Sequence, residues 1–241
     1  MNWDELRRTT AARIGLERAG PALATRPLLD LRLAHARARD AVHAALDEPR
    51  LRAALPHPAI AVRSRAPDRR AYLLRPDLGR ALAPTELLPP GPYDLAVVLA
   101  DGLSATAALR HAPPLLAELL PLPGVSLAPL VIAHEARVAL GDRIAEALGA
   151  AAILILIGER PGLSAPDSLG AYLTWSPGPR TTDAHRNCVS NIRPDGLSYA
   201  AAARTLAYLI ARMRDLRLTG VALKDHSTAV GSLAAPDLAI P

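Results

Sequence analysis

The chain contains no phenylalanine, and only one cysteine and one lysine, among its 241 residues. The lone Cys188 excludes a disulfide within the chain and is typical of a protein in a reducing compartment. No apolar run approaches the length of a membrane-spanning helix, and the first residues show no signal-peptide pattern. We therefore expect a cytoplasmic protein that does not enter a membrane.

Motifs of several common enzyme classes are also missing. The dinucleotide fingerprint G-x-G-x-x-G follows none of the expected strands, which argues against a nicotinamide or flavin cofactor. The segments that start at Gly102 and Gly162 each lack the last glycine of the nucleophile elbow G-x-S-x-G. One cysteine and seven scattered histidines give no zinc spacing, so we expect no metal held by side chains.

Positive charge is concentrated in the first third of the chain. Residues 1–80 carry sixteen arginines against nine acidic residues, a net charge of +7, whereas residues 81–241 carry a net charge of −2. A basic arm suggests an acidic partner surface, although a solvated helix surface explains the charge equally well. Acidic residues interleave with the arginines and aromatic residues are scarce, which disfavours nucleic acid as the partner.

The N-terminal part is expected to form a helical arm. Helices are predicted near residues 3–13 and 27–46, and the second carries a narrow stripe of mostly small apolar residues at helical spacing. Such a thin contact face is typical of a helix that packs on a partner. A strand is expected near Ile60–Ser64, and four prolines between residues 84 and 92 form a linker. We divide the chain into an arm with its linker, residues 1–90, and a second domain, residues 91–241.

The second domain alternates strands and helices. Apolar strands are predicted at residues 93–100, 127–133, 151–157 and 169–175, and helices lie between the first three. A long polar loop (176–194), a helix capped by Ser198 and a short strand at Val221–Leu223 complete the prediction. This alternation predicts an α/β fold with a doubly wound, mostly parallel sheet.

Ligands of such sheets bind beyond the carboxyl ends of the strands, and the chain places polar residues there. These side chains can form many hydrogen bonds but include no obvious base–nucleophile pair, so we expect a site that holds something large and polar. Glu159 is the one clear base, which leaves a self-sufficient small-molecule enzyme and an empty interaction scaffold as alternatives. The expected set is Asp101, Ser104, Glu159, Arg160 and Ser164, joined by Arg186, Asn187, Cys188, Asn191 and Arg193 if the long loop folds over the edge.

Recognisable motifs run along nearly the whole chain: Ala12–Gly15, Tyr72–Arg80, Ala100–Ala105, Arg137–Asp142, Gly158–Ser164, Pro166–Gly170, Arg186–Pro194 and Gly220–Asp225. Together they resemble the small (light) subunit of ethanolamine ammonia-lyase. The resemblance implies a Rossmann-like body with an N-terminal arm that grips a large subunit. In that family the large subunit, a TIM barrel, binds ethanolamine and carries the catalytic residues. Adenosylcobalamin lies between the subunits, and a radical mechanism yields acetaldehyde and ammonia.

The resemblance also indicates which residues of this chain contact the cofactor. It implies cobalamin contacts at Val138, Glu159 and Cys188, and no catalytic residue on this chain. Enclosure in a bacterial microcompartment is common in the family. We further expect that the site is shaped by Arg160, Asn187, Asn191 and Arg193.

The family keeps the nucleotide base of cobalamin on the cobalt. Proteins that replace this base with a histidine carry Asp-x-His-x-x-Gly, and Asp183-Ala184-His185 begins in the same way. Cys188 occupies the glycine position, so we interpret His185 as a surface loop residue.

Overall fold

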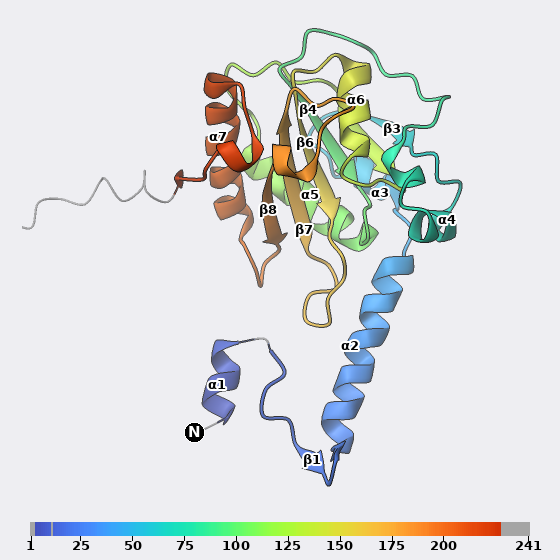
Figure 1. The fold of residues 1–241 in the computed structure, drawn as a ribbon, viewed down its shortest axis with the longest axis vertical. Helices are drawn as coiled ribbons and strands as arrows, with labels where there is room; N and C mark the ends of the chain where they lie inside the picture. The colour runs from blue at the N-terminus through green and yellow to red at the C-terminus, as the bar shows by residue number, and fades with distance from the viewer. Residues whose placement is uncertain (1–2, 11, 228–241) are drawn as a thin grey trace, which may run out of the picture.

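A computed structural model describes residues 3–10 and 12–227, so the last residues of the expected 91–241 domain lie outside the described residues. The chain forms an α/β body and an arm that extends away from it (Figure 1). The predicted fold class is confirmed. The arm consists of α1 (Trp3–Thr9), a short hairpin of β1 (Arg18–Ala19) and β2 (Ala22–Leu23), and α2 (Thr25–His43).

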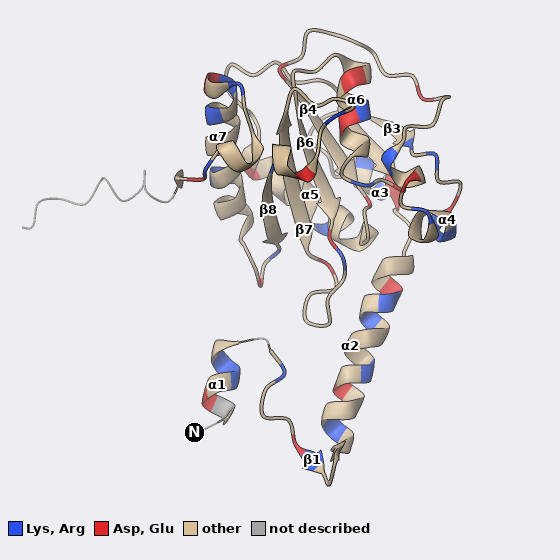
Figure 2. Cartoon of the chain, viewed as in Figure 1, with Lys and Arg blue, Asp and Glu red and all other residues tan. Residues whose placement is uncertain are grey.

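Helix α2 is the main element of the arm, and none of its residues is buried. The part of the predicted apolar stripe that lies in α2 is only half-buried: Leu28, Leu31, Ala34, Ala38 and Ala41. Two further leucines, Leu29 and Leu33, are 55% and 50% exposed. Basic and acidic residues interleave along the helix (Figure 2). Helices in proteins gain most of their stability from tertiary packing. Because α2 has no buried residue, it lacks most of that packing.

The body is built on a six-stranded mixed sheet with the strand order β3-β5-β4-β6-β7-β8. The first four strands in this order are parallel, and β7 and β8 are antiparallel to their neighbours. The strands are β3 (Ala59–Arg63), β4 (Leu95–Ala100), β5 (Leu130–His134), β6 (Ala152–Gly158), β7 (Leu169–Trp175) and β8 (Arg186–Ile192).

Helices cover both faces of the sheet. Because side chains alternate along a strand, Leu154 and Leu156 of β6 pack toward α5 (Ala105–Leu119) and α7 (Tyr199–Leu216), whereas Ile153 and Ile155 pack toward α6 (Leu140–Leu148). Every residue of β4 and β6 is buried, as expected for central strands of a parallel sheet.

Local sequence sets the helix ends. Ser104 caps α5 and Ser198 caps α7, each through a hydrogen bond from a backbone N–H three residues later. Gly149 ends α6 with a φ of 70°, which glycine adopts without strain.

Short elements surround this frame: α3 (Glu48–Ala53), α4 (Arg69–Leu74) and the 3₁₀ helices η1 (Leu78–Arg80), η2 (Asp183–His185) and η3 (Gly220–Ala222). Strand β3 lies in the region we assigned to the arm and linker, yet it pairs with β5 along its whole length. Part of residues 1–90 therefore belongs to the sheet, and the projecting part ends with α2.

Two predictions for the C-terminal half are wrong. The expected polar loop 176–194 contains strand β8, which pairs with β7, because buried Val189 and Ile192 hold it against the core. Its first residue, Arg186, is also buried, where two 2.7 Å hydrogen bonds to the Asp142 carboxylate neutralise it. The expected strand at Val221–Leu223 is instead the 3₁₀ helix η3, since Gly220 enters it with a φ of 76°.

Candidate functional site

The order of the strands creates a crevice between β4 and β6. The chain leaves β4 toward β5 on one side and then crosses back to β6 on the other, so adjacent β4 and β6 form a topological switch point. Open α/β sheets bind ligands beyond the carboxyl ends of the strands at such a point. Gly102 follows β4 there, and Glu159 follows β6.

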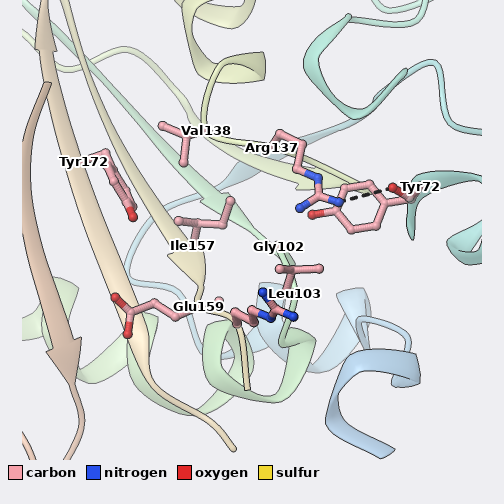
Figure 3. Close-up of a pocket in the computed structure, with 10 residues that line it drawn as sticks. Tyr72, Gly102, Leu103, Arg137, Val138, Ile157, Glu159 and Tyr172 are labelled. Atoms are coloured by element: carbon pink, nitrogen blue, oxygen red, sulfur yellow. Dashed lines mark hydrogen bonds between the residues drawn. The ribbon is translucent and has the colours of Figure 1, made fainter. Parts of the chain in front are cut away.

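A pocket of about 430 Å³ lies at this switch point (Figure 3). Its apolar part comes from Leu103, Val138 and Ile157, and its polar part includes Glu159 and Arg160. We call it the switch-point pocket. It is lined by Tyr72, Gly102, Leu103, Arg137, Val138, Ile157, Gly158, Glu159, Arg160 and Tyr172.

The glycines at the strand ends serve the contact between two loops. The Leu103 N–H donates to the Gly158 carbonyl at 2.9 Å. A Cβ on Gly102 would overlap that carbonyl, and a Cβ on Gly158 would overlap the Ser104 carbonyl. In the structure they let the loops after β4 and β6 approach each other.

Asp101 organises the strand ends from a buried position. Its side chain accepts from the Glu135 N–H at 2.9 Å and the Ala136 N–H at 3.0 Å, which ties the end of β4 to the loop after β5. Burial raises the pKa of Asp101 above its ordinary value. With only 2% of its surface exposed, this carboxylate supports the loops below the pocket.

Arg69 joins those loops to the arm. Its Nη1 donates to the Gly102 carbonyl at 2.8 Å and lies 3.5 Å from Asp101 and 3.3 Å from Glu135. Its Nε donates at 2.7 Å to the carbonyl of Val42, near the end of α2. One guanidinium therefore connects the arm helix to the floor of the switch-point pocket.

Ser104 is likewise a structural residue. Its hydroxyl accepts from the Ala107 N–H at the start of α5 and donates to the Pro166 carbonyl at 3.1 Å. This hydroxyl therefore fixes the segment after Glu159 against α5. Ser164, which we expected at the same edge, is exposed and does not line the pocket.

Glu159 lies in the pocket and also holds strand β8. Its Oε2 accepts from the Asn191 N–H at 3.2 Å, and Gly170 leaves room for the carboxylate beside β7. Figure 3 shows the carboxylate on the Tyr172 side of the pocket, away from Arg137. The Asn191 hydrogen bond occupies one carboxylate oxygen, and Oε1 can accept a hydrogen bond from a ligand.

Cys188 lies on the same face of the sheet as the pocket. It pairs in register with Tyr172, which lines the pocket. Cys188 is exposed. Partial burial of the sulfur raises the pKa of the thiol, which disfavours the nucleophilic thiolate at neutral pH.

The other predicted residues of β8 separate into two groups. The Asn187 amide donates to the Leu223 carbonyl at 2.8 Å and accepts from the Gly220 N–H at 2.8 Å, so its side chain holds η3 and does not reach the pocket. Asn191 lies near the end of β8 and Arg193 directly after it, where the Arg193 Nε donates to the Asn191 side chain at 2.9 Å. This segment reaches the pocket only through the Asn191 N–H on Glu159.

Sequence reasoning missed Tyr72, Arg137 and Tyr172 as pocket residues. Tyr72 is fully buried, and its hydroxyl donates to the Ala136 carbonyl at 2.9 Å. The Arg137 guanidinium stacks 4.3 Å above the Tyr72 ring. Tyr72 and Arg137 begin two of the motifs quoted above, but nothing in their spacing shows that they stack against each other.

Glu159 is the only carboxylate that lines the switch-point pocket, and burial raises the pKa of the Tyr172 phenol. Across the described residues, no three His, Cys, Asp or Glu side chains come together as candidate metal ligands. Within that same part of the chain, no helix combines the length and hydropathy needed to cross a membrane.

Comparisons with known proteins agree on one family. The family described as ethanolamine ammonia-lyase light chain matches residues 1–224. A protein of Bradyrhizobium diazoefficiens named ethanolamine ammonia-lyase small subunit is 54% identical over 235 residues, which cover 92% of this chain and 90% of the relative. Proteins with the same name from Ralstonia nicotianae and Azotobacter vinelandii are 51% and 52% identical, covering 92% and 93% of this chain and 88% of each relative.

Proposed function

The chain belongs to the ethanolamine ammonia-lyase light-chain family, and on this basis we propose that it is the small subunit of an ammonia-lyase that acts on ethanolamine together with a large subunit. The observation that carries the proposal is the family match over residues 1–224. The switch-point pocket adds support, because it contains Val138 and Glu159, two of the residues that the resemblance assigns to the cofactor. The absence of a base–nucleophile pair in the pocket agrees with a substrate site on the other subunit.

We propose that this pocket forms one side of an adenosylcobalamin site whose other side is the large subunit. The residues present fit such a ligand. An apolar floor of Val138 and Ile157 suits the flat corrin face, and the Glu159 carboxylate suits the amide side chains at its edge. His185 is exposed, and its Nδ1 accepts from the Thr182 N–H at 3.0 Å within the η2 turn, as expected of a surface loop residue.

The bound cofactor supplies the radical chemistry, and this chain positions and shields it. Glu159 accepts hydrogen bonds from corrin amides through Oε1, while Asn191 holds its other oxygen. Val138 and the protonated Cys188 thiol make packing contacts on the α6 face of the sheet. Arg160, exposed at the rim, contributes a further donor.

The arm supplies the contact with the large subunit in this proposal. Helix α2 has no buried residue and exposes Leu29 and Leu33, so its apolar side chains are available to a partner. Arg69 then links the docked helix to the pocket through Val42 and Gly102. Enclosure of the assembled enzyme in a microcompartment stays a prediction.

Co-expression of this chain with the large subunit tests the proposal, with ammonia release from ethanolamine and adenosylcobalamin as the measurement. We expect turnover by the complex and none by this chain alone. Turnover by the isolated chain would support a self-sufficient enzyme that uses Glu159 as base. A complex that binds no cobalamin would instead support an interaction scaffold.

A further inference from the structure

A second cavity of about 450 Å³ adjoins the switch-point pocket and shares Arg137 and Val138 with it. Arg80 and the start of α6 line one part, and the segment from Thr181 to Arg186 lines another. We propose that this side cavity binds a phosphate-type anion, a phosphodiester or phosphate group.

Arg137 gives the first argument, because it has a buried donor without an acceptor. Its Nη2 donates to the Tyr72 carbonyl at 3.3 Å, and its backbone N–H donates to the Gly79 carbonyl at 2.8 Å. Its Nε, however, is buried and has no hydrogen-bond partner among the described residues. Buried donors are nearly always satisfied, so Arg137 has unused hydrogen-bonding capacity at the wall that this cavity shares with the switch-point pocket.

Charge gives the second argument. No carboxylate in the described chain pairs with Arg80, which is exposed at the end of η1. Arg186 is already neutralised by Asp142, and Asp183, the one carboxylate lining the cavity, lies 3.5 Å from the Arg186 Nε. Arg80 and Arg137 therefore leave the cavity with excess positive charge, and guanidinium groups suit phosphate oxygens.

The start of α6 gives a third, independent argument. Val138 and Ala139, which precede this nine-residue helix, line the cavity, so the positive end of the helix dipole faces it. The Thr181 hydroxyl accepts from the Gly178 N–H at 2.8 Å and can donate its own proton to a ligand. The dipole of α6 and the Thr181 hydroxyl therefore both favour an anion in the cavity.

The anion has two chemical sources. One is the phosphodiester of the cofactor's nucleotide tail, which the shared wall with the switch-point pocket favours. This assignment rests on the proposed function. The other is free inorganic phosphate or a separate phosphate ester. Cobinamide keeps the corrin but lacks the nucleotide and its phosphate, so it distinguishes the two sources.

The test uses the co-expressed complex with Arg80→Ala, and Arg143→Ala as the matched control. Arg143 lies on α6 outside the cavity, where it pairs with Glu146 at 2.8 Å. Calorimetry measures the binding of inorganic phosphate, and absorbance titration measures the binding of cyanocobalamin and cobinamide. We expect Arg80→Ala to weaken phosphate and cyanocobalamin binding about tenfold and to leave cobinamide binding unchanged, because one charge-assisted contact is lost. Arg143→Ala should change none of the three.

The possible outcomes separate the two proposals. Loss of phosphate affinity with unchanged binding of both corrinoids supports the anion site and assigns it to a separate phosphate ligand. Equal affinities for wild type and Arg80→Ala with all three ligands overturn the site. If the wild-type complex binds phosphate in an Arg80-dependent way but no corrinoid, the cofactor assignment fails and the anion site stands.

Discussion

The strands of the body and the helix of the arm differ completely in how they are packed. Every residue of β4 and β6 is buried, whereas no residue of α2 is. The body therefore carries the interactions that stabilise it, because its apolar strands are covered on both faces. The arm exposes apolar side chains that gain stability only when a partner covers them. One chain thus combines strands that are packed on both faces with a helix that has no buried residue.

A leucine-to-alanine substitution in each region should show the largest difference in the free energy of unfolding. Leu154→Ala in β6 should lower the free energy of unfolding by about 3–5 kcal/mol, because it leaves a cavity in the core. Leu29→Ala in α2 should change it by less than about 0.5 kcal/mol, because Leu29 is 55% exposed. Denaturant titration of the full chain measures both values. Similar losses for the two variants would show that the arm is packed on the body in solution.

Arg69 connects the two regions, so its removal should have an intermediate effect. Arg69→Met should cost about 2–3 kcal/mol of unfolding free energy, because it leaves the Asp101 and Glu135 carboxylates without their cation. Burial already raises the pKa of both carboxyl groups. Without Arg69 they take up protons at still higher pH, so the deficit should be largest at neutral pH and shrink as the pH falls.

The matched control is Arg70→Met, since Arg70 is the exposed neighbour on the same helix. It should leave stability unchanged at every pH. A pH-independent deficit in Arg69→Met would contradict the assignment of Arg69 as the counterion of the two carboxylates.

Glu48 lies at the start of α3, just beyond the arm. Its substitution should have the smallest effect on the free energy of unfolding. Its carboxylate contacts Arg52 at 2.6 Å and His134 at 2.8 Å, and the Arg52 hydrogen bond lowers the pKa of Glu48. A lowered folded pKa contributes stability that is present above the unfolded pKa and lost as the pH falls through the folded value. Glu48→Gln should therefore cost about 0.5–1 kcal/mol at pH 7 and nothing well below pH 4. Thermal unfolding across this range checks it, and a cost that persists at low pH would contradict the ion-pair account.

Much of the body could be predicted from the sequence, because its central strands are continuous apolar runs. Strand β8 could not be predicted, because its sequence is mostly polar and polar segments are typical of loops. Its polar residues include Arg186, Asn187, Ser190 and Asn191. Only the buried Asp142 carboxylate makes a buried Arg186 acceptable there, and Asp142 is distant in sequence.

The candidate site could likewise be predicted only where its residues directly follow an apolar strand. Glu159 and Arg160 follow an unmistakable buried strand, so their place at the sheet edge could be inferred. The structural roles of Asp101 and Asn187 depend on contacts to Ala136 and Leu223, which no local pattern reveals. The stack of Arg137 on Tyr72 is hidden for the same reason.

Equilibrium binding of adenosylcobalamin to the assembled complex tests the central claim most directly. Glu159→Ala is compared with Asp195→Ala, an exposed acidic residue in the turn after β8, and size-exclusion chromatography confirms that both variants still assemble. Our account predicts that Glu159→Ala weakens cobalamin binding about tenfold, from the loss of a charge-assisted hydrogen bond, and that Asp195→Ala binds like wild type. Wild-type affinity in an assembled Glu159→Ala complex would contradict it.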